Sequence, residues 1–410
     1  MKSNTENKII QHMEQGKPQY NFNEVIDRHD TNAIKLERCK ALFGTEDVLP
    51  LWVADMDFKT PDFIIKAIQQ RLEHPILGYT MLPKEFYSST SKWIKDHHDW
   101  DVHREWLGFL PGIVPGLSFA VQALTSPGDE IIVQPPVYYP FFHVIEKNHR
   151  VLVTNPLKEE AGRFVMDFED LEQKFTAKTK LFILCNPHNP GGRVWSKEEL
   201  KQFAYICEKH QVTIISDEIH ADMVLPGSNC MHTPLATVSA WSEQNTVTFM
   251  APTKVFNMPG IISSAYIVPN SELRQRFALF LEASEMNGGN MFAGITAMAA
   301  YENGEEWRKQ MLDYVQGNIE YLADFLKNNI PQINPMIPEA SFLVWLDCEA
   351  LGMETDELHK FFSLKAGLGL NKGTIFGTGG EYHLRLNVAC PRSILEQAMK
   401  QLQQAVNSKQ

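Results

Sequence analysis

The amino-acid sequence predicts an α/β fold, with a mostly parallel central sheet covered by helices on both faces and a smaller α+β domain. Short apolar runs alternate with helical patterns over roughly 200 residues in the middle of the chain, as in strand–helix–strand units. From about residue 301 the pattern changes to long amphipathic helical stretches and two strand-like runs. We therefore expect an N-terminal segment (1–55) that joins the small domain, a large α/β domain (56–300) and a small C-terminal α+β domain (301–410).

Strands of the large domain are expected where short runs rich in Val, Ile and Leu lie between turn-forming residues. Continuous apolar runs of this kind are typical of parallel strands that are buried on both faces. They lie at 131–133, 151–154, 180–185, 212–216 and 246–250. The small domain is expected to add strands at 342–346 and 383–388, followed by a terminal helix.

Helix starts are indicated by capping residues. Thr60 and Pro61 predict a start at which the hydroxyl of Thr60 caps the helix and Pro61 occupies its first turn. Further helices are expected at 85–96 and 112–124. Ser196 and Glu199 have the spacing of a capping box, which predicts a helix running to about residue 210.

The composition excludes several classes of protein. The chain has 410 residues, and 38 Lys+Arg against 50 Asp+Glu give a net charge of −12, which argues against a nucleic-acid partner. No apolar stretch reaches the roughly 18 residues of a membrane-spanning helix. The six cysteines are scattered with no C-x-x-C pair, which favours reduced thiols in a cytoplasmic protein. Histidine spacing gives no metal site.

Polar residues of four chemical types lie at the ends of successive predicted strands. Asn189, Asp217, His220 and Lys254 fall at these ends. Because ligands of open α/β sheets bind beyond the carboxyl ends of the strands, these side chains are expected to converge on one crevice. Taken singly, each has an ordinary explanation: a turn, a loop cap, a core histidine or a surface lysine. Their order along the chain is much more specific than any of them alone.

Several longer strings accompany this order. They are LWVADMDF at 51–58, GYT at 78–80, PPVYYPF at 135–141, APTKVFN at 251–257, NGEEW at 303–307 and LRLN at 384–387. With these strings the chain resembles the fold-type I aminotransferase superfamily (class I/II), whose members bind pyridoxal 5′-phosphate (PLP). Within that superfamily it is similar to the MalY/PatB-type group of cystathionine β-lyases, which are C–S lyases. The resemblance runs from about residue 22 to the C-terminus and makes 56–300 the PLP-binding domain.

The resemblance implies roles for the central residues. Lys254 would form the Schiff base with the PLP aldehyde and then act as the catalytic base. Asp217 would pair with the pyridine nitrogen, and Asn189 would bind the ring 3′ oxygen and help to orient the substrate. His220 stands where many aminotransferases have a tyrosine, so a cofactor role and a structural role both remain open for it.

Further residues are implied around the cofactor and substrate. Tyr138 would stack on the ring and have a catalytic role. Without the resemblance, its aromatic string would be interpreted as a structural part of the core. Phosphate would be bound by backbone N–H groups of Ile113 and Val114 and by the hydroxyl of Thr253. Tyr79 would reach it from the partner subunit of a homodimer with shared active sites. The substrate-binding residues would be Arg385, which holds the α-carboxylate, together with Asn189 and the two side chains Tyr139 and Asp55.

Two positions depart from the aminotransferase pattern. The phosphate-binding arginine expected eight residues after the lysine is Ile262, and the serine expected three residues before it is Ala251. Loss of the arginine favours a lyase over a transaminase. We therefore expect α,β-elimination of L-cystathionine or related cysteine S-conjugates to pyruvate, ammonia and a thiol, which is homocysteine for cystathionine. The alternatives are an aminotransferase of amino acids and a PLP-binding regulatory protein with little turnover.

Overall fold

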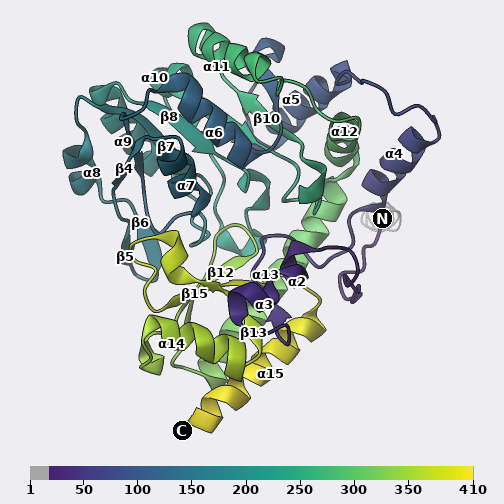
Figure 1. Ribbon diagram of the computed structural model, residues 1–410, viewed down its shortest axis with the longest axis vertical. Helices are drawn as coiled ribbons and strands as arrows, with labels where there is room; N and C mark the ends of the chain where they lie inside the picture. The colour runs from purple at the N-terminus through teal and green to yellow at the C-terminus, as the bar shows by residue number, and fades with distance from the viewer. Residues whose placement is uncertain (1–17, 410) are drawn as a thin grey trace, which may run out of the picture.

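The computed structural model describes residues 18–409, so residues 1–17 of the expected N-terminal segment and residue 410 lie outside it. The helices, labelled as in Figure 1, are α2 (Ile34–Glu37), α3 (Cys39–Phe43), α4 (Asp62–Leu72), α5 (Lys84–His98), α6 (Ile113–Leu124), α7 (Pro140–Lys147), α8 (Phe168–Lys174), α9 (Lys197–His210), α10 (Ala240–Asn245), α11 (Ser271–Ala283), α12 (Ala293–Asn303), α13 (Glu305–Asn329), α14 (Thr355–Lys360) and α15 (Arg392–Lys409). Across residues 18–409, none of them combines the length and apolar character that a bilayer crossing requires.

A seven-stranded sheet forms the larger part of the molecule, in the order β2-β10-β9-β8-β7-β3-β4. Its strands are β2 (Leu107–Leu110), β3 (Glu130–Val133), β4 (Val151–Thr154), β7 (Thr179–Cys185), β8 (Thr213–Asp217), β9 (Thr246–Met250) and β10 (Ser264–Ile267). Neighbours from β9 to β4 pair in parallel, and β10 runs antiparallel to both β9 and β2. The predicted fold class is therefore confirmed.

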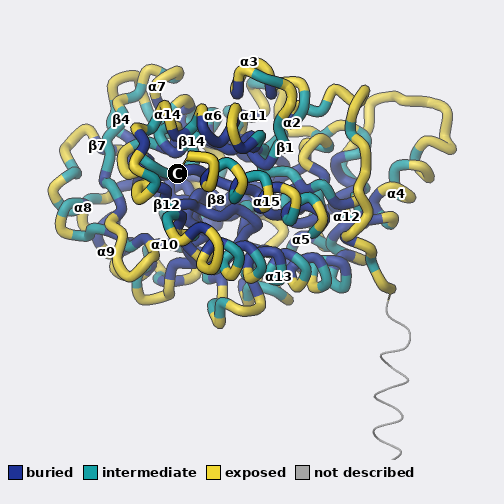
Figure 2. The backbone as a smooth tube through the Cα atoms, turned by 90° about the horizontal axis from the view of Figure 1, so that it is seen from below, coloured by how far each residue is buried: buried dark blue, intermediate teal, exposed yellow. Residues whose placement is uncertain are grey.

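Helices cover both faces of this sheet because alternate strand residues belong to different cores. In β7, Leu181 and Ile183 pack with α6, α7 and α11, whereas Phe182 and Leu184 pack with α8 and α9. Both sets are almost completely buried. A strand that is apolar on both faces can be satisfied only between two helical layers, which is the reason for its continuous apolar sequence. Figure 2 shows these buried segments in the interior and exposed loops around them.

A smaller antiparallel sheet forms the second domain, in the order β11-β12-β15-β14. Its strands are β11 (Asn334–Met336), β12 (Leu343–Asp347), β14 (Asn371–Lys372) and β15 (His383–Asn387), and α13 packs against α15 beside it. The N-terminal strand β1 (Leu49–Pro50) pairs in parallel with β13 (Leu368–Gly369) of this domain. Figure 1 accordingly shows α2 and α3 beside the C-terminal part of the chain. The remaining strands, β5 (Lys158–Glu160) and β6 (Arg163–Val165), form a separate hairpin.

One predicted helix start is wrong in detail, and another is confirmed. Helix α4 begins at Asp62 with Pro61 in the capping position and no side-chain cap. The hydroxyl of Thr60 instead donates to the carbonyl of Asn257, 2.8 Å away, so it ties the chain to the loop after β9. At α9 the predicted capping box between Ser196 and Glu199 is present. The domain boundaries at 55 and 300 stay a prediction.

Candidate active site

A cavity of about 330 Å³ lies at the carboxyl ends of β7, β8 and β9, facing the start of α6. The predicted site residues that line it are Ile113, Val114, Tyr138, Asn189, Asp217, His220, Thr253 and Lys254. Parallel strands deliver these side chains because their carboxyl ends meet at one edge of the sheet: Cys185 and Phe249 both pair with Asp217 across it.

Lys254 follows β9 in a tight turn. Its Nζ donates to the carbonyl of Ala54, 2.6 Å away in the N-terminal segment. Burial lowers its pKa to about 8, and the guanidinium of Arg385 acts in the same direction, whereas the carboxylates of Asp55 and Asp217 oppose the shift. Lys254 can therefore supply a neutral amine near neutral pH far more readily than an exposed lysine.

Asp217 ends β8 and is almost fully buried. One carboxylate oxygen, Oδ1, accepts a hydrogen bond from the backbone N–H of Ile219 at 3.2 Å. Burial raises its pKa to about 7; the neighbouring Glu218 adds to the rise, and Lys254 opposes it. No cationic side chain forms an ion pair with Asp217 within residues 18–409. A buried carboxyl without such a partner is costly to ionise, so a bound cation would be favoured beside it.

Arg385, on β15 of the small domain, reaches the same region. Its Nη1 donates to Asn189 Oδ1 at 3.0 Å. Its Nη2 donates to the carbonyl of Trp52 at 3.0 Å and to Asn371 Oδ1 at 2.6 Å. Burial lowers the pKa of Arg385 to about 10. Every one of these acceptors is neutral, so the buried guanidinium lacks a carboxylate partner among the described residues, and an anionic ligand would supply one.

Two polar side chains frame the cavity differently. His220 is buried and lines it, and its Nδ1 has no hydrogen-bond partner among the described residues. Burial lowers the pKa of His220 to about 3, and Lys254 and Arg385 lower it further. The imidazole is therefore neutral at physiological pH. Tyr138 also lines the cavity, and burial raises the pKa of its phenol, so the hydroxyl stays protonated.

The start of α6 forms one end of the cavity. Gly112 precedes the helix with φ of +114°, a conformation that L-residues rarely adopt, and it turns the chain into the first helical residues. The N–H groups of Ile113 and Val114 belong to the first turn, where no intrahelical acceptor is available. Thr253 and Ile262 line the same cavity, and Ile262 brings no charge to it. This end can bind an anion through backbone N–H groups and a hydroxyl.

Four predicted site residues do not line this cavity: Arg385, which contacts it through Asn189, and Tyr139, Asp55 and Tyr79. Tyr139 is in contact with Tyr138, His143 and Phe376 rather than with the cavity. Asp55 faces an adjoining hollow of about 890 Å³ that shares Ala54 and Lys254, and its Oδ2 accepts from Arg28 at 2.7 Å. Tyr79 lies in the loop between α4 and α5 and is fully exposed in the single chain.

The structure also adds residues that the sequence did not single out. Cys185, Ser263 and Ser264 line the cavity, and Asn371 binds Arg385. Cys185 could have been found because it ends a predicted strand immediately before the Asn189 loop. Asn371 lies on a two-residue strand with no periodic signal, so no local pattern indicated its hydrogen bond with Arg385.

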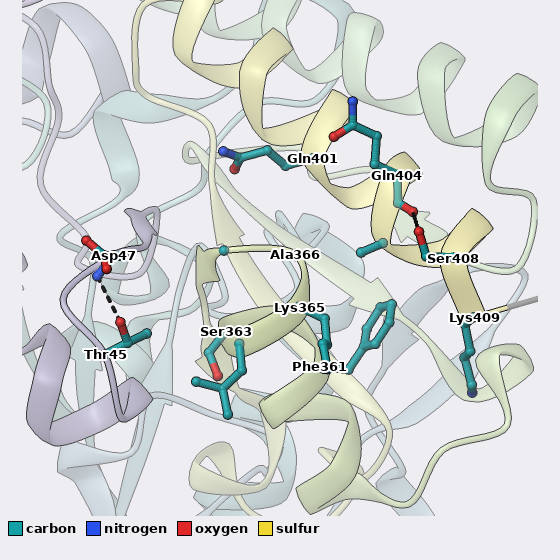
Figure 3. A pocket seen from close by; sticks show the side chains of 13 residues that line it. Thr45, Asp47, Phe361, Ser363, Lys365, Ala366, Gln401, Gln404, Ser408 and Lys409 are labelled. Carbon is teal, nitrogen blue, oxygen red and sulfur yellow. Dashed lines mark hydrogen bonds between the residues drawn. The ribbon is translucent and has the colours of Figure 1, made fainter.

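Another cavity, of about 810 Å³, lies in the small domain between the end of α3, the segment 361–367 and α15 (Figure 3). Figure 3 shows amide and hydroxyl side chains around it, together with the aromatic ring of Phe361 and the charged residues Asp47, Lys365 and Lys409. None of the predicted site residues lines it. The smaller cavity at the sheet edge is therefore the better candidate for chemistry, because the amine and the carboxyl with shifted pKa values gather there.

Comparison with known proteins identifies the family to which the chain belongs. The family model for aminotransferase class I and II matches residues 46–402. Cystathionine beta-lyase PatB of Bacillus subtilis (strain 168) is 41% identical over 388 residues, covering 94% of this chain and 100% of PatB. Protein MalY of Escherichia coli (strain K12) is 30% identical over 398 residues, covering 95% and 99%. The crystal structure of cystalysin from Treponema denticola, which contains a pyridoxal 5′-phosphate cofactor, matches with a TM-score of 0.92 at 32% identity, covering 96% and 100%. The chain belongs to the aminotransferase class I and II family, with a fold-type I architecture, and within that family it is similar to the PatB and MalY type.

Proposed function

We propose that this protein is a PLP-dependent C–S lyase that cleaves L-cystathionine or related cysteine S-conjugates to pyruvate, ammonia and a thiol. One observation carries the proposal: a buried carboxyl without a cation (Asp217) and a buried guanidinium without a carboxylate (Arg385) flank one lysine of lowered pKa. The 41% identity to a cystathionine beta-lyase supports the choice of reaction.

The donor set of the cavity fits PLP. Lys254 offers an amine for its aldehyde, Asp217 a carboxylate for its pyridine nitrogen, and the start of α6 offers N–H groups for its phosphate. Thr253 adds a hydroxyl at the phosphate end. Asn189 and His220 also line the cavity and would hydrogen-bond the substituents of the PLP ring. When bound, PLP would supply an electron sink for the negative charge that develops at the substrate Cα.

Residues of the chain bind the substrate and transfer the protons of the reaction. Arg385 binds the substrate α-carboxylate in place of its neutral acceptors and, with Asn189, fixes the orientation of the Cα–H bond. The neutral amine of Lys254 takes the Cα proton, and the Cβ–S bond breaks with its electron pair on sulfur. The lysine ammonium can return a proton to the thiolate. Water hydrolyses the released enamine to pyruvate and ammonia.

The homodimer is part of the proposal. Tyr79 and the apolar residues around it, Ile76, Leu77 and Met81, are exposed in the single chain between α4 and α5. An exposed apolar loop of this kind suits contact with a second copy, through which Tyr79 would complete the phosphate end of the partner's cavity.

Product analysis tests the reaction. The purified protein, incubated with L-cystathionine, is expected to release pyruvate and homocysteine in equal amounts without any added 2-oxo acid. Amino transfer to 2-oxoglutarate without pyruvate formation would instead support the aminotransferase, which shares the first proton transfer. Binding of PLP with neither product would support the regulatory protein. Lys254→Ala should abolish pyruvate release.

A further inference from the structure

A second carboxylate is buried directly behind Asp217. Glu218 follows it at the end of β8, and its side chain is completely buried. Glu218 Oε1 accepts from the hydroxyl of Ser216 at 2.8 Å and from the backbone N–H of Leu235 at 3.0 Å. Its Oε2 is 2.8 Å from Nε2 of His232. The carboxylate therefore accepts hydrogen bonds on both oxygens, from three residues in two segments of the chain: Ser216 on β8, and His232 and Leu235 in the segment 232–235.

These bonds hold the end of β8 in place. The backbone N–H of Glu218 donates to the carbonyl of Phe249 on β9, and the carbonyl of Asp217 accepts from the N–H of Asn186 after β7. The Glu218 side chain adds the segment 232–235, which lies outside the sheet. Asp217 is thus flanked by a residue whose backbone and side chain are both anchored, which limits how far its own carboxylate can move.

Glu218 also places charge near the cavity. His232, whose side chain is 1% exposed, is its sole ion-pair partner among the described residues, and burial lowers the pKa of that imidazole. The ring of His232 packs against His98 on α5, which in turn pairs with Asp222 at 2.9 Å. No lysine or arginine forms an ion pair with Glu218 within residues 18–409. The Nδ1 atom of His232 has no hydrogen-bond partner among the described residues, as expected of a neutral imidazole that donates from Nε2 to the Glu218 carboxylate, so this carboxylate next to Asp217 has no cationic partner.

We propose that Glu218, anchored by His232, Ser216 and Leu235, is a positioning residue for the cofactor: it fixes the Asp217 carboxylate and adds its own negative charge to the field that a protonated pyridine nitrogen meets there. The inference rests on the proposed function. It gives Glu218 a role that the candidate cavity does not reveal, since Glu218 does not line it. A purely structural role would stabilise the fold without distinguishing one ligand atom from another.

The test compares two ligands that differ at that atom. PLP and its carbocyclic analogue, in which C–H replaces the pyridine nitrogen, are titrated into cofactor-depleted protein. Glu218→Gln removes the charge and keeps the shape, and it is expected to weaken the Kd for PLP about tenfold while leaving the Kd for the analogue nearly unchanged. Ser216→Ala, which keeps the charge, should have a smaller effect on PLP.

Glu305→Gln is the matched control. Glu305 on α13 also pairs with a histidine, His97, at 2.8 Å, and in addition with Arg308 and Lys309; it does not line the cavity and has no hydrogen bond to β8 among the described residues. It should change neither Kd. Equal weakening of both ligands in Glu218→Gln, no weakening at all, or the same PLP-selective loss in Glu305→Gln would overturn the inference.

A second variant and the wild-type protein keep the test decisive. If Glu218→Gln does not fold, Glu218→Asp replaces it: withdrawal of the carboxylate from Leu235 should weaken PLP severalfold and spare the analogue, and an unchanged PLP Kd would overturn the inference. A wild-type protein that binds no PLP would refute the proposed function itself. A wild-type protein that binds PLP as tightly as Glu218→Gln would refute only the role of Glu218.

Discussion

Burial shifts the pKa values of both Lys254 and Asp217 toward the neutral form of each group. The proposed chemistry uses the neutral form of Lys254, as a base, but the ionised form of Asp217, beside the pyridine nitrogen. With a pKa of about 8, roughly a tenth of Lys254 is the free amine at pH 7, against well under a thousandth at the usual pKa of 10.5. Asp217, with a pKa of about 7, holds its proton much longer than an exposed carboxyl. A pyridinium beside Asp217 would reverse that shift, because an adjacent opposite charge favours the ionised form.

Asp217→Asn should reveal the cost of this buried carboxyl in the cofactor-free protein. A carboxyl whose folded pKa is raised from 3.8 to about 7 stabilises the fold fully at low pH, and this stability is lost as the pH rises toward 7. Between pH 5 and pH 8 the wild type should therefore lose free energy of unfolding relative to the variant, by on the order of a few kcal/mol, because asparagine does not titrate. Urea denaturation at both pH values measures this difference, and a constant difference would contradict the raised pKa.

Arg385→Lys tests the substrate end. Lysine keeps the charge but loses the planar pair of donors that matches a carboxylate. The KM for L-cystathionine should rise about tenfold or more, whereas the Kd for PLP should stay near the wild-type value. Steady-state kinetics and cofactor titration measure the two quantities. A large loss of PLP affinity with an unchanged KM would place Arg385 at the cofactor instead.

The chemical types at the site were predictable from motifs, but their mutual contacts were not. Lys254, Asp217 and Asn189 each follow a strand that the sequence predicts, so their convergence follows from the parallel sheet. The hydrogen bond between Arg385 and Asn189 joins residues 196 positions apart, across the two domains. No local pattern encodes such a pair, because it depends on how β15 packs against the loop after β7.

At the scale of elements, the parallel strands, including the edge strand β4, were predictable, and the antiparallel edge was not. Runs such as 151–154 and 246–250 match β4 and β9 because continuous β-branched sequence is unambiguous there. Strands β2 and β10 contain Gly, Ser and Ala and few β-branched residues, so they carry little strand signal although every residue of both is buried. The capping role predicted for Thr60 was wrong because its hydroxyl donates to the carbonyl of Asn257, which is far away in the sequence and which a local capping rule does not consider.

Gly112→Ala tests the start of α6. With φ of +114° and ψ of 156°, this position lies in a region that essentially only glycine adopts. The nearest atom to an added Cβ would be 3.5 Å away, an ordinary contact, so the cost comes from the backbone. We expect a loss of about 1–3 kcal/mol in the free energy of unfolding, and weaker binding of inorganic phosphate. Denaturant unfolding and phosphate titration measure both, and unchanged values would show that the glycine conformation is not required.

At the scale of the molecule, the N-terminal segment joins the two sheets over the site. Four consecutive carbonyls of this segment are bound by side chains of other elements: Trp52 by Arg385, Val53 by Asn387, Ala54 by Lys254 and Asp55 by Asn387. The residues that hold this segment thus include two that the proposed reaction uses. Formation of the site and assembly of the two domains are therefore linked.

Mixed dimers test the proposed sharing of active sites. Lys254→Ala and Tyr79→Ala chains should each be nearly inactive, but a mixture refolded together should regain up to about a quarter of wild-type activity. Half of the dimers are then mixed, and each mixed dimer has one site with both residues intact. Pyruvate release from L-cystathionine measures the recovery. A lack of recovery with both chains folded would contradict the contribution of Tyr79 from the partner.

The absorbance spectrum of the purified, undialysed protein tests the central claim most directly. A visible band is expected from PLP bound to Lys254; it should shift on addition of L-cystathionine and be absent from Lys254→Ala. Asp217→Asn should retain less cofactor than the wild type under the same conditions. A colourless wild-type protein that takes up no added PLP, or a band that persists unchanged in Lys254→Ala, would contradict the account.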